Sequence, residues 1–305
     1  GRKIHLQPIP LLGGWAPYLT MTLVIGLLWL SGSVRDPKVD TDLLLGLLIS
    51  GALLVIGGYL DDRYALRWYQ SIIFPLTASF IALFSGLQVQ FITNPLGGIV
   101  NFESLQIIGQ VIVFLWLLAM MMTVKLLDGV DGLVGSIGTI AALVIFAVSL
   151  RWDEPQSLTS YASLILAGSL IGFLIHNWHP AKIFLGESGT FIGFALAVLA
   201  ILTGGKIATA LLVMGLPMLD VVWVIVRRWR GHRSIVLADS GHLHHRLLAM
   251  GLGHPQVVLA MSSISLLFGA AAILAPSYGK LVALAGLTFI MVTFGLYITK
   301  HQHET

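Results

Sequence analysis

The sequence has 305 residues, of which 57% are hydrophobic and 10% are charged, and its formal net charge is +3. Soluble domains carry about 25% charged residues, so this composition excludes a water-soluble globular protein and makes lipid the solvent for most of the chain. Because cysteine is absent, disulfides, thiolate nucleophiles and cysteine-ligated metals are excluded as well.

Apolar runs long enough to cross a bilayer follow one another along the chain. A spanning helix needs about 20 residues, and a lipid-exposed strand could not satisfy its backbone at that depth. The sequence therefore predicts an all-α integral membrane protein with about ten transmembrane helices, folded as a single polytopic domain over residues 1–305. The runs are 13–32, 43–60, 69–86, 105–124, 133–150, 159–178, 190–204, 207–226, 256–275 and 281–299.

Between the third and fourth runs, a small β-hairpin is expected near residues 90–102. Short β-type runs there flank Asn94-Pro95 and Gly97-Gly98, which are turn signals. Ten spans would place both termini on one side of the membrane, and the loops on that side carry 12 of the 17 lysines and arginines and all ten histidines. The positive-inside rule makes that side cytoplasmic. We therefore expect the chemistry on the cytoplasmic face and the hairpin outside.

Polar segments on this side hold the candidate functional residues, and the first ends the second run. Asp61 and Asp62 are adjacent there. Adjacent carboxylates repel unless a cation, a proton or a metal lies between them. The plain alternative is a solvated helix end with Arg63 and Arg67 as neighbours.

The second segment contains Asp128 and Asp131, each followed by glycine. Their spacing of three puts both carboxylates on one face of a helical turn, and glycine lets a ligand approach the backbone closely. Repeated Asp-Gly favours a hard cation or a phosphate. The alternative is an ion pair between Asp128 and Lys125.

The third segment, residues 177–190, contains Asn177, Lys182 and Glu187. Its stretch from Gly186 to Gly189 leads into the next predicted helix, whose free N–H groups favour anions. Glu187 is either a carboxylate at the start of that helix or a metal ligand.

The fourth segment, residues 227–255, combines arginines that suit anionic lipid headgroups with a histidine-rich stretch. His242, His244 and His245, with Asp239, could bind zinc or present imidazoles to a phosphate-rich ligand.

Asp220 lies inside the eighth run, three residues after Pro217. An ionisable residue within a span indicates function. The alternative is a buried, protonated carboxyl that bonds to a neighbouring helix.

These segments, in this order and on one face, resemble the polyprenyl-phosphate N-acetylhexosamine-1-phosphate transferases, in particular the branch typified by WecA and TagO. The likeness extends over essentially the whole chain. Its motifs are Arg2-Lys3-Ile4-His5, the stretch from Pro8 to Gly14, Asp61-Asp62, Asp128 to Gly132, Asn177 with 180–184, Pro217 with Asp220, and His242 to His245.

The resemblance implies an enzyme of the bacterial cytoplasmic membrane that initiates a cell-envelope glycan. Such an enzyme transfers N-acetylhexosamine 1-phosphate, with GlcNAc favoured, from a UDP-sugar to undecaprenyl phosphate and releases UMP. It implies Mg²⁺, with Mn²⁺ as a substitute, contacts with membrane lipids, a homodimer, and no nucleic-acid partner. It also implies a further span before Arg2, so that the parent protein would have eleven.

Carried over position by position, the resemblance also assigns roles to individual residues. The catalytic residues would be Asp61, Asp62, Asp128 and Asp131, and the metal ligands Asp62, Asp128 and Glu187. The substrate-binding residues would be Lys125, Asn177, Lys182, Asp220, His242, His244, His245 and Arg246.

The chain departs from the family pattern at several of these positions. Asparagines are usual at Met122 and Lys125, aspartate at Glu187, and often arginine at Leu11. Lys125 would either neutralise the carboxylates that attract Mg²⁺ or contact the diphosphate directly. One alternative to an active transferase is a degenerate homologue that holds the lipid carrier or the sugar nucleotide. A transporter is disfavoured, because the acids lie at helix ends rather than at the bilayer midplane.

Overall fold

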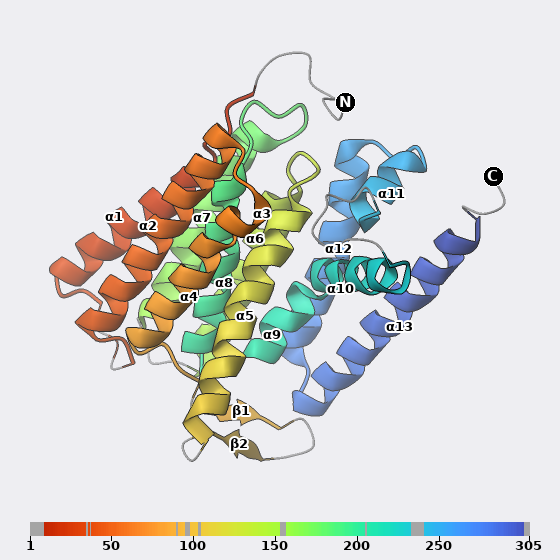
Figure 1. The fold of residues 1–305 in the computed structure, drawn as a ribbon. Helices are drawn as coiled ribbons and strands as arrows, with labels where there is room; N and C mark the ends of the chain where they lie inside the picture. The colour runs from red at the N-terminus through yellow and green to blue at the C-terminus, as the bar shows by residue number, and fades with distance from the viewer. Residues whose placement is uncertain are drawn as a thin grey trace.

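The computed structural model describes residues 9–34, 36, 38–89, 91–94, 98–102, 105–152, 157–204, 206–232 and 241–301. Helices dominate this part of the chain, and one two-stranded sheet accompanies them (Figure 1). The first helices are α1 (Trp15–Leu30), α2 (Thr41–Tyr64), α3 (Trp68–Ser71), α4 (Ile73–Phe84), α5 (Gln106–Leu127), α6 (Leu133–Trp152) and α7 (Leu158–Asn177). The short 3-10 helix η2 (Glu187–Gly189) follows, then α8 (Thr190–Leu202), α9 (Ile207–Val213), α10 (Gly215–Arg230), α11 (Leu243–Ala249), α12 (His254–Leu274) and α13 (Ser277–His301).

Each of the ten predicted apolar runs contains a helix, so the predicted all-α fold is confirmed. Among the described residues, five helices are long and apolar enough to cross a membrane, namely α2, α5, α6, α7 and α12, and a sixth span forms if the bent pair α9–α10 counts as one. The remaining apolar helices are shorter: α1, α8, the pair α3–α4 and the described part of α13. The chain is therefore a multi-pass membrane protein, and the number of ten spans stays a prediction.

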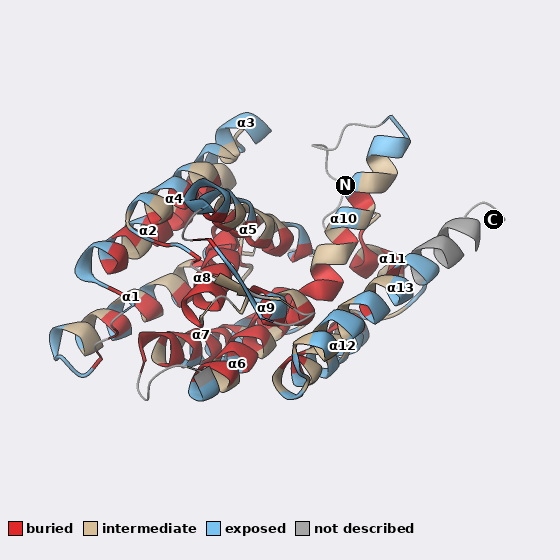
Figure 2. Ribbon diagram, turned by 90° about the horizontal axis from the view of Figure 1, so that it is seen from below, coloured by how far each residue is buried: buried red, intermediate tan, exposed pale blue. Residues whose placement is uncertain are grey.

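α8 forms the centre of the bundle, and all its residues are buried (Figure 2). Helices α2, α5, α6, α7 and α9 pack against it. The outer helices instead expose large apolar side chains, such as Leu30 and Phe84, which are 85% and 88% accessible. Scattered apolar residues are normal on any protein surface, but continuous apolar exteriors on several helices indicate lipid contact.

Local signals in the sequence explain where individual helices begin. The Asp40 side chain accepts a hydrogen bond from the Leu43 N–H at 2.8 Å and caps α2. The Ser157 hydroxyl accepts one from the Ser160 N–H at 3.2 Å and caps α7. Both side chains satisfy backbone groups that a helix start leaves without partners.

The predicted hairpin is confirmed. Strands β1 (Phe91–Thr93) and β2 (Ile99–Asn101) pair antiparallel, with Ile92 opposite Val100. The hairpin lies at one end of the bundle, whereas α3, α11 and the C-terminal end of α2 lie at the other (Figure 1). The end opposite the hairpin is the one to which the sequence assigned its polar segments.

The eighth predicted run is broken into α9 and α10, whose axes differ by 78°. The break falls at Met214, three residues before Pro217. Proline has no N–H, so Pro217 cannot donate to the carbonyl of Val213, the last residue of α9. The break turns α10 out of the direction of α9.

Candidate active site

Asp61 and Asp62 lie in the last turn of α2, which ends where Ala65 adopts a left-handed conformation. The carboxylate of Asp61 accepts a hydrogen bond from the Leu66 N–H at 3.1 Å. That of Asp62 accepts one from the Glu187 N–H at 3.0 Å. Glu187 is brought there by Gly186, whose φ of +66° suits glycine and turns the chain into η2. Two segments 125 residues apart thus meet at one carboxylate.

Lys125 lies in the last turn of α5 and points into the same cluster. Its Nζ lies 2.6 Å from Glu187 Oε2 and 3.6 Å from Asp61 Oδ2. The predicted alternative of an ion pair with Asp128 is wrong. The Lys125 ammonium is instead held by carboxylates of η2 and α2, away from the end of its own helix.

The same helix end corrects the expectation that Asp128 and Asp131 share a helical turn. Both residues lie in the turn between α5 and α6, and Asp131 is bonded to His179 rather than aligned with Asp128. Asp128 is accessible to solvent, although many protein atoms lie around its carboxyl group. This burial, followed by the negative charges of Glu187, Asp62 and Asp131, raises the pKa of Asp128 to about 7.

The donor set of this carboxylate cluster fits Mg²⁺. The predicted ligands Asp62, Asp128 and Glu187 offer the hard oxygen atoms that Mg²⁺ prefers. Their mutual repulsion raises the pKa of Asp128, and a divalent cation would reverse that effect. Within the described chain, however, the group of three ligand side chains whose atoms lie within 4.8 Å of one another is Asp131, His179 and His254. The metal role of Asp62, Asp128 and Glu187 stays a prediction.

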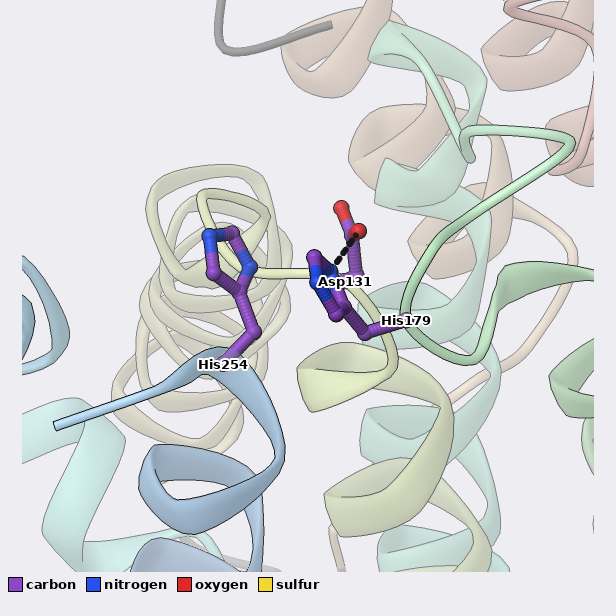
Figure 3. Close-up of side chains that lie close together, drawn as sticks. All are labelled: Asp131, His179 and His254. Carbon is purple, nitrogen blue, oxygen red and sulfur yellow. Dashed lines mark hydrogen bonds and ion pairs between the residues drawn. The ribbon is translucent and has the colours of Figure 1, made fainter.

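Asp131, His179 and His254 come from three separate elements (Figure 3). His179 Nδ1 lies 2.8 Å from Asp131 Oδ2, which also accepts the Ala181 N–H at 3.2 Å. The rings of His179 and His254 stack with centroids 4.5 Å apart and planes 20° apart. The group therefore forms a hydrogen-bonded stack that joins the start of α12 to the loops after α5 and α7.

Asn177, the last residue of α7, is buried, and its side-chain oxygen and nitrogen each make a hydrogen bond. Its Oδ1 accepts the Gly132 N–H at 3.0 Å, and its Nδ2 donates to the Ile183 carbonyl at 2.9 Å. These bonds tie the turn after α5 to the segment that leads to η2. The structure thus gives Asn177 a positioning role, and its predicted contact with substrate stays a prediction.

Asp220 is 4% exposed and holds the start of the histidine-rich segment. Its Oδ2 lies 2.9 Å from His242 Nδ1, and its Oδ1 accepts the Leu243 N–H at 2.8 Å. Because a carboxylate only accepts, His242 carries its proton on Nδ1 and presents Nε2 to the other side. The sequence offered a carboxyl bonded to a neighbouring helix as the alternative to a functional role. In the structure, the bonding partners of Asp220 are His242 and Leu243, at the start of α11.

His244, two residues further on, presses against the turn that follows Asp128. A side chain on Gly129 would collide with its ring, so this position requires glycine. Burial, followed by the neighbouring His245 and His242, lowers the pKa of His244 to about 3, and the imidazole is neutral at pH 7. Neither of its buried ring nitrogens has a hydrogen-bond partner in the described part of the chain. Such atoms call for a ligand, since buried polar groups are normally paired.

Of the remaining predicted site residues, one is buried and one is exposed. Arg246 is buried in α11, beside His245 in sequence. Lys182 is exposed, and its ammonium makes no ion pair or hydrogen bond with a described residue. The zinc interpretation of the histidines included Asp239, which lies outside the described residues, and His242, His244 and His245 do not form a close ligand group among the described residues.

Sequence reasoning missed three contributors: His179, His254 and Ser71. The sequence analysis used the two histidines only in counting how many histidines lie on the predicted cytoplasmic side. The signal that could have marked them is their place beside proline, at the end of α7 and at the start of α12. Ser71 accepts a hydrogen bond from Lys125 Nζ at 2.9 Å, and nothing in its sequence context marks it.

Comparison with known proteins matches residues 44–204 to the family model described as glycosyl transferase family 4. This range contains the carboxylate cluster and Lys125 but ends before Asp220 and the histidine segment. A probable undecaprenyl-phosphate N-acetylglucosaminyl 1-phosphate transferase of Bacillus subtilis is 28% identical over 300 residues, which cover 96% of this chain and 80% of that protein.

Two further relatives are also named as N-acetylglucosaminephosphotransferases. A decaprenyl-phosphate N-acetylglucosaminephosphotransferase of Mycobacterium leprae is 33% identical over 282 residues, covering 85% of this chain and 71% of that protein. A putative UDP-N-acetylglucosamine–dolichyl-phosphate N-acetylglucosaminephosphotransferase of Sulfolobus acidocaldarius is 27% identical over 249 residues, covering 79% of this chain and 73% of that protein.

Proposed function

The chain belongs to the polyprenyl-phosphate sugar-1-phosphate transferases of glycosyl transferase family 4, and we propose that it transfers GlcNAc 1-phosphate from UDP-GlcNAc to undecaprenyl phosphate. UMP leaves, and the product is the lipid-linked diphosphate sugar that begins a cell-envelope glycan. The three relatives are all named for N-acetylglucosamine, which supports this sugar. The excess of lysine and arginine at the polar end supports a cytoplasmic active site in the inner membrane.

One observation carries the proposal: acidic side chains from α2, the α5–α6 turn and η2 gather at the polar end of an apolar bundle, beside unpartnered imidazole nitrogens. A lipid phosphate and a soluble nucleotide diphosphate can meet only where membrane and water meet. In the reaction, an oxygen of the lipid phosphate bonds to the β-phosphorus of the sugar nucleotide, and the bond from that phosphorus to the bridging oxygen breaks. Such transfers depend mainly on alignment and on neutralising charge.

The proposed roles follow from the chemistry of each group. Asp62, Asp128 and Glu187 would hold Mg²⁺, which when bound offsets the negative charge of the diphosphate. The neutral ring of His244 can donate one hydrogen bond and accept another, which suits a phosphate ester or a sugar hydroxyl. His242, His245 and Arg246 lie beside it. The lipid phosphate is largely ionised at neutral pH, so the site has little need of a strong base.

The test is UMP release by the purified protein in detergent with UDP-GlcNAc and undecaprenyl phosphate, with and without Mg²⁺. We expect release that requires both the carrier and the metal and that Asp128→Asn reduces at least about a hundredfold. Asp42→Asn, in the first turn of α2 and therefore at the other end of that helix, is the matched control. Release without the carrier, or undiminished release by Asp128→Asn, would contradict the proposal. Tight binding of UDP-GlcNAc without turnover would favour the degenerate binding protein.

A further inference from the structure

The Lys125 side chain is docked among oxygen atoms that come from three other elements. Its Nζ lies 2.6 Å from Glu187 Oε2 on η2 and 3.6 Å from Asp61 Oδ2 on α2. It also donates a hydrogen bond to Ser71 Oγ on α3 at 2.9 Å. The side chain is 27% exposed, so it does not extend freely into solvent.

These contacts match what an ammonium group can offer. It donates one hydrogen bond to the Ser71 hydroxyl, and the carboxylates of Glu187 and Asp61 lie within ion-pair distance. Carboxylate and hydroxyl oxygens are also the ligands of hard divalent cations. The ammonium of Lys125 and a divalent cation therefore compete for some of the same atoms.

We propose that the Lys125 ammonium is a resident cation of the carboxylate cluster and competes with a divalent cation for Glu187 and Asp61. The competition sets how tightly the cluster binds divalent ions. This inference rests on the proposed function only in assuming that the cluster is the metal site.

The charges explain why the competition weakens binding without abolishing it. Asp61 and Glu187 outnumber the one ammonium that contacts them both, so negative charge remains to attract a metal ion. A divalent ion that enters must displace Lys125 from Glu187 or lie close to it. In either case it meets the positive charge at short range, where an ion pair of unit charges is worth several-fold more than in bulk water.

The experiment measures Mn²⁺ binding, from the loss of the free-ion EPR signal, by the purified full chain in nanodiscs without nucleotide or lipid carrier. Lys125→Gln should bind Mn²⁺ at least about tenfold more tightly than the unchanged protein. Lys125→Arg keeps the positive charge and should keep the weak binding. Lys38→Gln removes an exposed lysine before α2, about 30 Å from Asp61 along that helix, and should change nothing.

An unchanged or weaker Mn²⁺ affinity in Lys125→Gln overturns the proposal, and so does an equal gain in Lys38→Gln. Thermal unfolding without divalent ions verifies that each variant is folded. If the glutamine variant is unstable, Lys125→Met keeps the apolar stem without the charge and answers the same question. Adding Glu187→Gln to Lys125→Gln should remove the gain. The Mn²⁺ measurement contains no substrate, so a negative result does not contradict the proposed transfer reaction. Likewise, a negative transfer assay does not change the meaning of the Mn²⁺ affinities.

Discussion

Asp220→Asn tests whether the carboxylate at the broken span sets the tautomer of His242. The carboxylate accepts two hydrogen bonds, from the Leu243 N–H at 2.8 Å and from His242 Nδ1 at 2.9 Å. Asparagine has one oxygen and one NH₂ group in the same space. If its oxygen keeps the bond to Leu243, the NH₂ group faces His242 Nδ1, which must then lose its proton. Nε2 changes from a hydrogen-bond acceptor to a donor.

The cost to folding is modest, because the shape and the number of bonds are kept. Hydrogen bonds to charged groups contribute about 1.5–3 kcal/mol, and neutral ones about 0.5–1.5 kcal/mol. Exchanging two of the former for two of the latter lowers the free energy of unfolding by about 2 kcal/mol. The cost to turnover is larger, because a misassigned donor in the site costs about 10²- to 10³-fold in kcat, or about 2.7–4 kcal/mol.

The assay is the steady-state release of UMP, giving kcat and KM, together with thermal unfolding of the same preparation. Asp36→Asn is the matched control. Asp36 is similarly buried, at 7% exposed, and accepts the Lys38 N–H at 3.0 Å, but it lies between α1 and α2 at the opposite end of the bundle. It should lower stability and leave kcat unchanged. A folded Asp220→Asn protein with kcat within twofold of the original would refute the reasoning.

Three further outcomes follow from the same geometry. Burial and nearby carboxylates raise the pKa of Asp128 from 3.8 to about 7. The metal-free protein should therefore lose thermal stability as pH rises from about 4 to about 7. Asp128→Asn should flatten that dependence when melting temperatures are measured across this pH range. Gly129→Ala forces a methyl group against the His244 ring. Overpacking of this kind costs about 1–3 kcal/mol, so we expect an about tenfold loss of UMP release and a lower melting temperature. Unchanged values of both would contradict the contact. Leu196→Ala in the buried centre of α8 should lower the free energy of unfolding by about 2–5 kcal/mol without shifting the KM for UDP-GlcNAc, measured by denaturant melts and kinetics.

The positions of the helices could be predicted because long apolar runs have few other ways to satisfy their backbone in lipid. The hairpin followed from turn residues at fixed offsets. What the pattern did not show was the length of each helix. α8 is short yet wholly buried, since its neighbours rather than lipid cover it. α11, with seven residues in a polar stretch, has no sequence periodicity to mark it and depends on packing against α12.

The residue types of the site could be predicted, but their partners could not. Spacing along one helix suggested an ion pair between Lys125 and Asp128, but the Lys125 ammonium pairs with carboxylates of other elements. The actual partner, Glu187, lies in η2 and reaches Lys125 only because Gly186 turns the chain. The stacked pair His179 and His254 joins residues 75 positions apart. Local spacing carries no information about such contacts.

The structure also separates the predicted residues by whether their polar atoms are already satisfied. Asp131, Asn177 and Asp220 accept hydrogen bonds from the backbone N–H groups of Ala181, Gly132 and Leu243. Changing them should disturb stability together with activity, because an unpaired buried N–H is costly. Asp128 makes no hydrogen bond to a described residue, and His244 has two unpartnered ring nitrogens. Changing those two should reduce activity while leaving stability unchanged or raised, since a polar atom without a partner stabilises the fold only when a ligand binds it. Sequence reasoning could not separate the two groups, because the distinction lies in backbone N–H groups that only the folded chain brings near.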